Sequence, residues 1–477
     1  MKRPMILCGT VALCLSLLMI YTSEKFIFFA AVGLVITAIT LLYLRRFTHI
    51  LPLVAVCLII LLMSIRCIGE TECIKTAKAL KKDTSIKGVI TDVDYNENSV
   101  SYKVKTGKIK IRIISTKGIY AKQGDEISAD IRIVSSGEYN DFARDVHATA
   151  FLLKLKSLTK TNSISSHLDS MRKSVQNLFF KSGGGDEAAM LIGLTLGEKG
   201  YISDSLSNNI RRSGVSHMIV VSGLHLGIIV GTFLNIAHRI KINRQLTGAV
   251  GIIMVLFIIA LTGFTVSVLR SALAYLILLF GYLIGRKPDA LNSLFAAVLI
   301  LSLINPLVVT GISFQLSASA TFGVLVLAPA IDAVVMKHKG NKWYDKIAGA
   351  LSGVVCTAFA ANLTTLPFTL WHFGTLSTVS LLTNMLTNHL VTGVLILAVL
   401  GIATCFIEPV SAAVLLLSRV AVRVQIYFIN SIGSLPFAEY VSKSPKLLAV
   451  IIFCIMAGFT YLVIKLKKGV TLSGNSL

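Results

Sequence analysis

The densest cluster of residues that could do chemistry lies in an otherwise uncharged stretch. The run from His217 to His225 holds two histidines and Ser222, and no Asp, Glu, Lys or Arg occurs between Arg212 and Arg239. If this run is one continuous helix, the three side chains fall within an arc of about 140°, at about 100° per residue. His217, Ser222 and His225 would then line one face.

Two kinds of chemistry suit this face. An ionisable group inside a bilayer is costly, so its default interpretation is a functional one. The alternative is structural: the histidines would form hydrogen bonds between helices and do nothing more. Ser222 with a histidine base could form a nucleophile, but no carboxylate lies nearby to orient the imidazole, which disfavours catalysis. Gly223, Gly227 and Gly231 form an adjacent small-residue stripe that predicts close approach of another helix.

Polar residues recur inside other apolar stretches. Arg270 opens an apolar span and could contact phosphate or extend its head group to the membrane surface. Gln315 and Ser317 lie in a segment too polar for a lipid-facing helix, which favours a bundle interior or a water-filled path. Asn384 lies inside a later span. The run from Asn362 to Pro367 is predicted to break the span before it.

Composition identifies the medium in which these residues work. Of the 477 residues, 54% are hydrophobic and 14% are charged, against roughly a quarter charged in soluble domains. A soluble enzyme is therefore excluded. The net charge of +23 is interpreted mainly as the basic bias of cytoplasmic loops. No cysteine and histidine spacing typical of a metal site occurs, and no cofactor is expected.

The apolar runs predict a polytopic α-helical membrane protein of about 12 spans, because about 20 helical residues cross the hydrocarbon. The loop charges place both termini in the cytoplasm. Three spans come first: Met5–Ile20, Phe26–Leu44 and Leu51–Cys67. Nine more are predicted near 217–237, 246–264, 270–285, 290–305, 309–330, 347–371, 378–406, 410–432 and 447–464.

The segment between these two groups of spans has a different pattern, and the loop charges place it outside the cell. It predicts an inserted β domain, with an OB-fold as the obvious candidate for five short strands. The strands are Ser85–Asp94, Ser99–Val104, Lys108–Ser115, Glu126–Val134 and Ala148–Leu155, with a hairpin around Thr106-Gly107. Strand alternation places Lys108, Lys110 and Arg112 on one face. That face could track a phosphate backbone or be an ordinary solvated strand face.

The predicted domains follow from these patterns. Ser165–Phe180, Asp186–Leu196 and Ser203–Arg212 are predicted to lie at the membrane surface, with a break at Gly183–Gly185. Cys67 and Cys73 flank the outer end of the third span and could form a disulfide or stay free. The domains are 1–68 (three spans), 69–160 (outer β domain), 161–213 (interfacial helices), 214–465 (membrane core) and 466–477 (cytoplasmic tail).

Several motifs, in the right order, resemble those of the ComEC family, which forms the DNA channel of bacterial natural transformation. The run Gly214–Gly227, with Gly-Val-Ser-His and Ser-Gly-Leu-His-Leu-Gly, looks like the family signature. Further stretches resemble its other motifs: Asn140–Arg144, Leu191–Lys199, Val268–Ala272, Gly311–Ser317, and Leu366-Pro367 with Asn384. His389 stands where the family often has a proline, which leaves a helix break there in doubt.

The resemblance implies a channel that passes single-stranded DNA through the plasma membrane of a bacterium. The strand would meet the basic outer domain and follow a polar path past Ser222, His225, Gln315–Ser319 and Asn384, with Arg270 at the entrance. No phosphate-binding loop of an ATPase is present, so a separate cytoplasmic ATPase or helicase is expected. A surface DNA receptor and a homo-oligomer are compatible with this picture.

Two further functions stay open. Many family members carry a C-terminal metallo-β-lactamase-like domain, whose ligand motif is lacking here, so any nuclease is expected to be a separate protein. A small-solute secondary transporter would show internal repeats of inverted topology, and no convincing repeat is seen. An intramembrane hydrolase would use Ser222 and His225; the protein is expected not to be an enzyme.

Overall fold

The computed structural model describes residues 5, 8–14, 16, 50–96, 99–116, 121–136, 139–160, 164–218, 221, 223–262, 266–286, 289–335 and 343–474. The predicted spans Met5–Ile20 and Phe26–Leu44 lie largely outside these ranges. Within them, six helical stretches are long and apolar enough to cross a membrane, which identifies a membrane protein. These are Arg244–Thr262, Ile312–Val335, Ser352–Phe373, Ser380–Ala403, Glu408–Gly433 and Pro445–Leu466.

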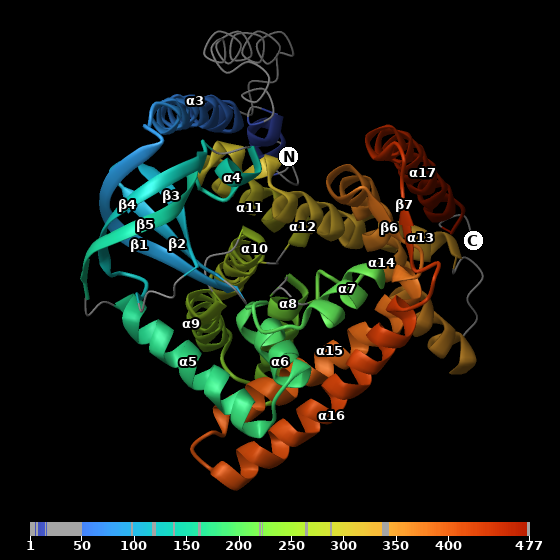
Figure 1. Ribbon diagram of the computed structural model, residues 1–477. Coiled ribbons are helices and arrows are strands. Elements are labelled where there is room, and N and C mark those ends of the chain that lie inside the picture. Colours follow the sequence, from blue (N-terminus) through green and yellow to red (C-terminus); the bar gives the residue numbers. More distant parts are fainter. Residues whose placement is uncertain are drawn as a thin grey trace. The chain divides into compact units, whose positions relative to one another are not determined.

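The chain divides into two compact units, which are described separately. Unit 1 comprises residues 1–175 and 230–314, and unit 2 comprises residues 176–229 and 315–477. Unit 1 contains a closed five-stranded barrel (Figure 1) of β1 (Asp83–Asn96), β2 (Ser99–Thr106), β3 (Ile109–Ser115), β4 (Glu126–Ser135) and β5 (Ala148–Thr159). The predicted strands match these bounds to within a few residues.

The barrel is built from an antiparallel meander closed by β5. Neighbours run in the order β1-β2-β3-β5-β4, with β4 paired back onto β1, and only the β3–β5 pairing is parallel. Burial alternates along β3, so Ile109, Ile111 and Ile113 enter the core as predicted. The predicted hairpin is also present, with Thr106 opposite Ile109 and Gly107 at a φ of 59°.

The third predicted span is longer than its apolar run. α3 extends from Ile50 to Lys78, well past the predicted end at Cys67, so the helix continues into the segment assigned to the outer domain. Cys67 and Cys73 both lie on this helix as free thiols. Six helical residues rise about 9 Å, which exceeds the Cα separation that a disulfide can bridge, so the alternative of a disulfide is wrong.

The remaining helices of unit 1 pack closely. They are α4 (Tyr139–Ala143), α9 (Arg244–Thr262), α10 (Val266–Leu283) and α11 (Ala290–Ile304), while α5 (Ile164–Ser182) crosses the division between the units. A Cβ added at Gly248 would lie 3.0 Å from the Leu283 Cβ, so the glycine allows α9 and α10 to approach. Arg172 donates from Nε and Nη2 to Leu261 O (2.7 Å) and Ala260 O (2.9 Å), at the end of α9.

The described part of unit 2 is helical apart from a small two-stranded antiparallel sheet of β6 (Thr375–Ser377) and β7 (Glu439–Val441). Its helices are α6 (Asp186–Leu196), α7 (Asp204–Arg212), α13 (Ala328–Val335), α14 (Trp343–Phe373), α15 (Ser380–Ala403), α16 (Glu408–Gly433) and α17 (Pro445–Gly474). α15 and α16 form an antiparallel pair (Figure 1). Ser411 at the start of α16 donates to Gly401 O over 2.8 Å.

Two expectations for the helices need correction. α14 runs unbroken through Pro367, and the hydroxyls of Thr364 and Thr365 donate to carbonyls one turn earlier, at Ala360 and Ala361. α6 is not amphipathic as predicted, because eight of its residues are buried and a helix that is apolar all round belongs in a core; its place at the membrane surface stays a prediction. At His389, where the resemblance left a helix break in doubt, α15 continues.

Candidate functional site

The histidine run is divided between a turn and a helix. α8 begins at Gly223 and ends at Arg239, while His217 lies in a turn before it. The premise of one continuous helix is therefore wrong. Ser222 lies outside the described residues, so its place beside the histidines stays a prediction. His225 is buried within α8.

The segment before α8 packs tightly on the start of α15. Gly214 has a φ of +78°, and a Cβ added there would lie 2.5 Å from the Ser380 Cβ and 2.8 Å from the Ser377 Cβ. Glycine is therefore needed both for its left-handed backbone and for the close approach. The end of α7 fixes the other side of this segment, because Arg212 Nη2 donates to Leu435 O over 2.8 Å.

Asn384 belongs to a buried polar cluster, here named the polar seam, whose members come from three separate segments of unit 2. Met218 Sδ accepts from Thr387 Oγ1 at 3.4 Å and lies 4.0 Å from Gln425 Nε2. The seam consists of Met218, Thr383, Asn384, Thr387 and Gln425, all of which are buried. It joins the turn that carries His217 to α15 and α16.

The polar seam leaves two buried acceptors unsatisfied. Asn384 Oδ1 and Gln425 Oε1 have no hydrogen-bond partner among the described residues. Each unmet buried group costs about 1–3 kcal/mol, and such groups in native proteins call for an explanation such as water or a ligand. The sequence reasoning found Asn384 but missed Gln425 and Met218. A glutamine in an apolar span was the available signal.

Gln315 and Ser317 lie on α12 (Ile312–Phe322), which leads into a π-helical segment, Gly323–Leu327. Gln315 Oε1 lies 2.7 Å from His372 Nε2 near the end of α14. The carbonyl of Ser317 accepts from Thr321 Oγ1 over 2.8 Å. His372 was not predicted as a functional residue. Gln315 thus contacts the imidazole of His372 on a neighbouring helix, which agrees with a position inside the bundle and not on a lipid-facing surface.

Arg270 lies on α10, in unit 1, and its residue surface is only 3% exposed. Its Nη2 donates to Ser271 Oγ over 3.0 Å. The alternative that this side chain extends to the surface is therefore wrong for the folded chain. A buried guanidinium in an apolar helix is a costly arrangement, which keeps Arg270 a candidate for function.

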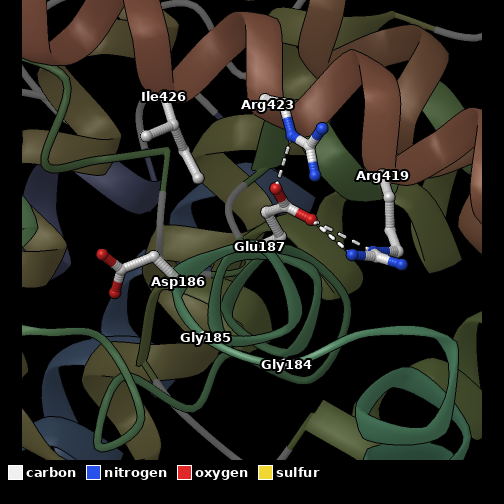
Figure 2. A pocket seen from close by; sticks show the side chains of 7 residues that line it. All are labelled: Gly184, Gly185, Asp186, Glu187, Arg419, Arg423 and Ile426. Carbon is white, nitrogen blue, oxygen red and sulfur yellow. Dashed lines mark hydrogen bonds and ion pairs between the residues drawn. The ribbon is translucent and has the colours of Figure 1, made fainter.

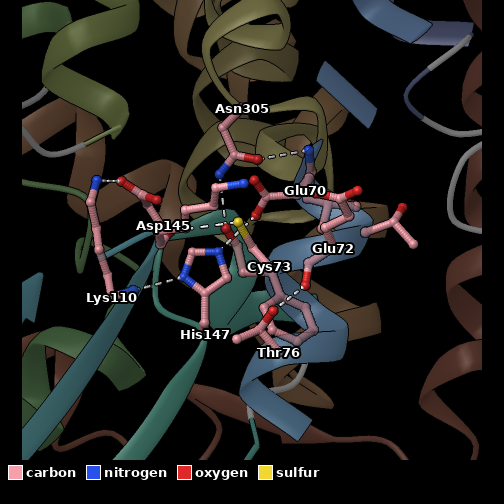
Figure 3. A network of polar contacts seen from close by, with 12 residues as sticks. Glu70, Glu72, Cys73, Thr76, Lys110, Asp145, His147 and Asn305 are labelled. Atoms are coloured by element: carbon pink, nitrogen blue, oxygen red, sulfur yellow. Dashed lines mark hydrogen bonds and ion pairs between the residues drawn. The ribbon is translucent and has the colours of Figure 1, made fainter. Parts of the chain in front are cut away.

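The predicted basic face of the barrel is largely paired with carboxylates. Lys110 Nζ pairs with Asp145 (Figure 3), and Arg112 Nη1 lies 3.5 Å from Asp141 Oδ1. Lys108 is exposed, and no carboxylate of the described residues pairs with its side chain. The three basic residues therefore differ, and Lys108 has the side chain most available to an external phosphate.

A buried histidine attaches α3 to the barrel at the same place. His147 Nε2 lies 3.1 Å from Glu70 Oε1 of α3, and the Lys110 backbone N–H donates to His147 Nδ1 over 3.1 Å (Figure 3). Because Nδ1 accepts, the other nitrogen carries the proton of a neutral ring. These contacts join the barrel to the helix that contains the third predicted span.

Fold and site together define a polytopic helical membrane protein with a five-stranded barrel and buried polar groups among its membrane helices. The competence protein family model matches residues 194–467. Because this match covers more than half of the chain, the protein belongs to that family, and the resemblance found in the motifs is confirmed. The match includes the whole polar seam, α12 and α14.

Two curated relatives are similar to the chain. ComE operon protein 3 of Bacillus subtilis (strain 168) is 25% identical over 251 residues, 52% of this chain and 31% of the relative. Recombination protein 2 of Haemophilus influenzae (strain ATCC 51907 / DSM 11121 / KW20 / Rd) is 24% identical over 204 residues, 41% of this chain and 26% of the relative. The matched regions thus span about a third or less of each relative. No solved structure matches the chain.

Proposed function

We propose that this protein carries single-stranded DNA across the bacterial cell membrane during natural transformation. The observation that supports this most directly is that the region matched by the competence family contains the buried polar seam. A phosphate backbone cannot enter hydrocarbon, because isolated charges are far too costly there. A protein that passes DNA therefore needs a polar route, and unsatisfied polar groups between membrane helices suit one.

In this proposal the route lies within the membrane core, residues 214–465. His217, Ser222, Gly223, His225, Gln315, Ser317 and Asn384 are proposed to line it, and Arg270 to contact phosphate. Met218 joins the turn carrying His217 to Thr387 of α15 and to Gln425 of α16, and Asn384 is buried three residues before Thr387 on α15. Polar groups that lack partners when the protein is empty can bond to water or to the moving strand instead.

The barrel is proposed to be an OB-fold on the outer side of the membrane. Its neighbour order β1-β2-β3-β5-β4 and its single parallel pairing, β3 with β5, support that assignment. Lys108 is proposed as its DNA contact, with smaller contributions from the paired Lys110 and Arg112. The full proposal includes about 12 spans with both termini cytoplasmic, a surface DNA receptor, a cytoplasmic ATPase or helicase, and a separate nuclease.

The test is delivery of labelled external DNA to the cytoplasm. Wild type would be compared with a deletion strain and with His225→Ala and Arg270→Ala strains at matched expression, with surface DNA binding as the control. The proposal expects surface binding to persist while delivery collapses in all three. If delivery is lost only in the deletion strain, the protein is still the DNA conduit, and the His225 and Arg270 side chains have a structural role. Unchanged delivery in the deletion strain would overturn the proposal and favour small-solute transport.

A further inference from the structure

Two arginines occupy the middle of a candidate membrane span, where the sequence reasoning placed no function. α16 is a 26-residue helix that contains Arg419 and Arg423 one turn apart. At 1.5 Å per residue, Arg419 is about 16 Å from the Glu408 end and Arg423 about 15 Å from the Gly433 end. A hydrocarbon layer about 30 Å thick would surround both. Arginines at that depth are rare and mark functional surfaces.

One carboxylate serves both guanidinium groups (Figure 2). Glu187 Oε2 accepts from Arg419 Nη2 over 2.7 Å, and Glu187 Oε1 accepts from Arg423 Nε over 2.7 Å. Asp186 points away from the arginines in this view, and its carboxylate accepts from the backbone N–H and the hydroxyl of Ser203 instead. The arginine pair therefore carries one positive charge more than its facing carboxylate neutralises.

The two arginines differ in how firmly they are held. The Arg419 side chain is 20% exposed and also donates to the Ser182 carbonyl, and a Cβ at Gly183 would collide with its guanidinium. The Arg423 side chain is 69% exposed, and among the described residues only its Nε has a hydrogen-bond partner. Its terminal Nη groups are thus available to another acceptor.

An open cavity of about 400 Å³ lies in front of these groups. It is lined by Gly184, Gly185, Asp186, Glu187, Arg419, Arg423 and Ile426. A Cβ added at Gly184 or Gly185 would meet nothing within 4 Å. No atom of the described residues therefore fills the space next to these two glycines. A guanidinium that is mostly exposed at this depth cannot face lipid tails, so the cavity must contain water, an anion or protein.

We propose that Arg419 and Arg423 form a binding site for a phosphodiester of the transported strand, with Glu187 occupying the phosphate position in the empty protein. This inference rests on the proposed function. Guanidinium groups bind phosphate oxygens through paired hydrogen bonds, as they bind carboxylate oxygens here. Lipid phosphate is less suited, because head groups lie at the ends of α16 rather than near its centre. Exchange of Glu187 for phosphate would let a strand bind and leave.

The experiment measures binding of a short fluorescent oligothymidylate to the purified full chain in phosphatidylcholine nanodiscs, over a range of salt concentrations. Arg423→Gln is expected to weaken binding about fourfold near 0.15 M salt and to lower the salt slope by about 0.7, which is one lost phosphate contact. Glu187→Gln is expected to tighten binding by a similar factor, because the competing carboxylate is gone. A purely structural ion pair would not give this increase.

Matched variants separate the outcomes. Arg211→Gln removes an arginine of similar exposure, 55%, which also pairs with one carboxylate, Glu439, at 3.5 Å; it should bind like the parent. Arg423→Lys keeps the charge and should keep the salt slope. If Arg423→Gln and Glu187→Gln both bind like the parent, the inference is wrong and the proposed function stands. If the parent binds no oligonucleotide, both are wrong.

A lipid arm tests the competing source of phosphate. Thermal unfolding of parent and Arg423→Gln would be compared with and without short-chain phosphatidylglycerol. Equal lipid effects on both proteins support the nucleic-acid assignment. Loss of lipid stabilisation in Arg423→Gln, with oligonucleotide binding unchanged, would assign the site to lipid and overturn the proposal.

Discussion

Gln315 Oε1 lies 2.7 Å from His372 Nε2, and this contact joins α12 to the last turns of α14. The first prediction concerns the energy of this pair. Gln315→Leu and His372→Phe should each destabilise the protein, and the double variant should lose less than the sum. The expected coupling is about 0.5–3 kcal/mol, measured by unfolding in detergent. Ser319→Ala is the control, since among the described residues its hydroxyl donates within its own helix, to the carbonyls of Gln315 and Leu316. Additive losses would show that the contact contributes nothing.

The second prediction separates the basic residues of β3. Lys110→Met should lower stability by about 0.5–1 kcal/mol, because it breaks a partly exposed ion pair with Asp145. Lys108→Met should leave stability unchanged, since no described carboxylate pairs with that side chain. In oligonucleotide binding the order should reverse, with Lys108→Met the weaker binder. Equal binding by both variants would remove the outer barrel face from the proposed DNA path.

The third prediction concerns the turn before α8. Gly214→Ala should destabilise the protein by about 1–3 kcal/mol, because a side chain is strained in the left-handed region and its Cβ would clash with Ser380. Gly231→Ala is the matched control. Gly231 is helical with nothing within 4 Å of an added Cβ, so alanine should stabilise by about 0.5–1 kcal/mol. Thermal unfolding of both variants measures the difference, and similar shifts would contradict this account of Gly214.

The fourth prediction tests whether the polar seam lines the DNA path or is purely structural. Gln425→Met removes a buried carbonyl oxygen that has no partner among the described residues, so stability should be equal or higher. Delivery of labelled DNA to the cytoplasm should nevertheless fall several-fold if the seam lines the path. Ser418→Ala on the same helix is the control, because within the described part of the chain the Ser418 hydroxyl has one partner, Val394 O, to which it donates over 3.2 Å. Unimpaired delivery by Gln425→Met would make the polar seam purely structural.

The fifth prediction is a pH dependence of the barrel. Hydrogen bonds from Arg132 to Asp83 and from Lys156 to Asp130 hold the pKa of each carboxyl below its ordinary value of 3.8. A lowered folded pKa contributes stability above the unfolded pKa, and that stability is lost as the pH falls through the folded pKa. The β1–β4 pairing, joined by Asp83 and Arg132, and the β4–β5 pairing, joined by Asp130 and Lys156, should therefore loosen only below about pH 4.

Hydrogen exchange of β1 and β4 peptides, corrected for intrinsic rates, measures this loosening. Exchange protection should be constant from neutral pH down to about pH 4 and fall below it. The Asp83→Asn and Asp130→Asn double variant is the control, because it should show no such fall. A parent chain with the same protection as this variant at every pH would contradict the assignment to these two carboxyls.

Some features were predictable because they depend on local pattern. Strand alternation fixed the inward side chains of β3, and the apolar runs located α9, α15 and α16 to within a few residues; α17 starts as predicted but ends at Gly474, ten residues past the predicted end of its span. Competence family membership followed from motifs in order. The end of α3 was missed, because helix propensity carries the polar continuation Ile68–Lys78 as readily as an apolar one.

The sequence by itself thus determined a membrane protein of the competence family with an inserted β domain, since composition, periodicity and motif order are written along the chain. Only the tertiary structure decided which distant residues meet. Gln425 reaches Met218 across 207 positions, His372 reaches Gln315 across 57, and Glu187 reaches Arg419 across 232. Such pairings depend on how helices pack against one another, which a 3.6-residue period does not encode.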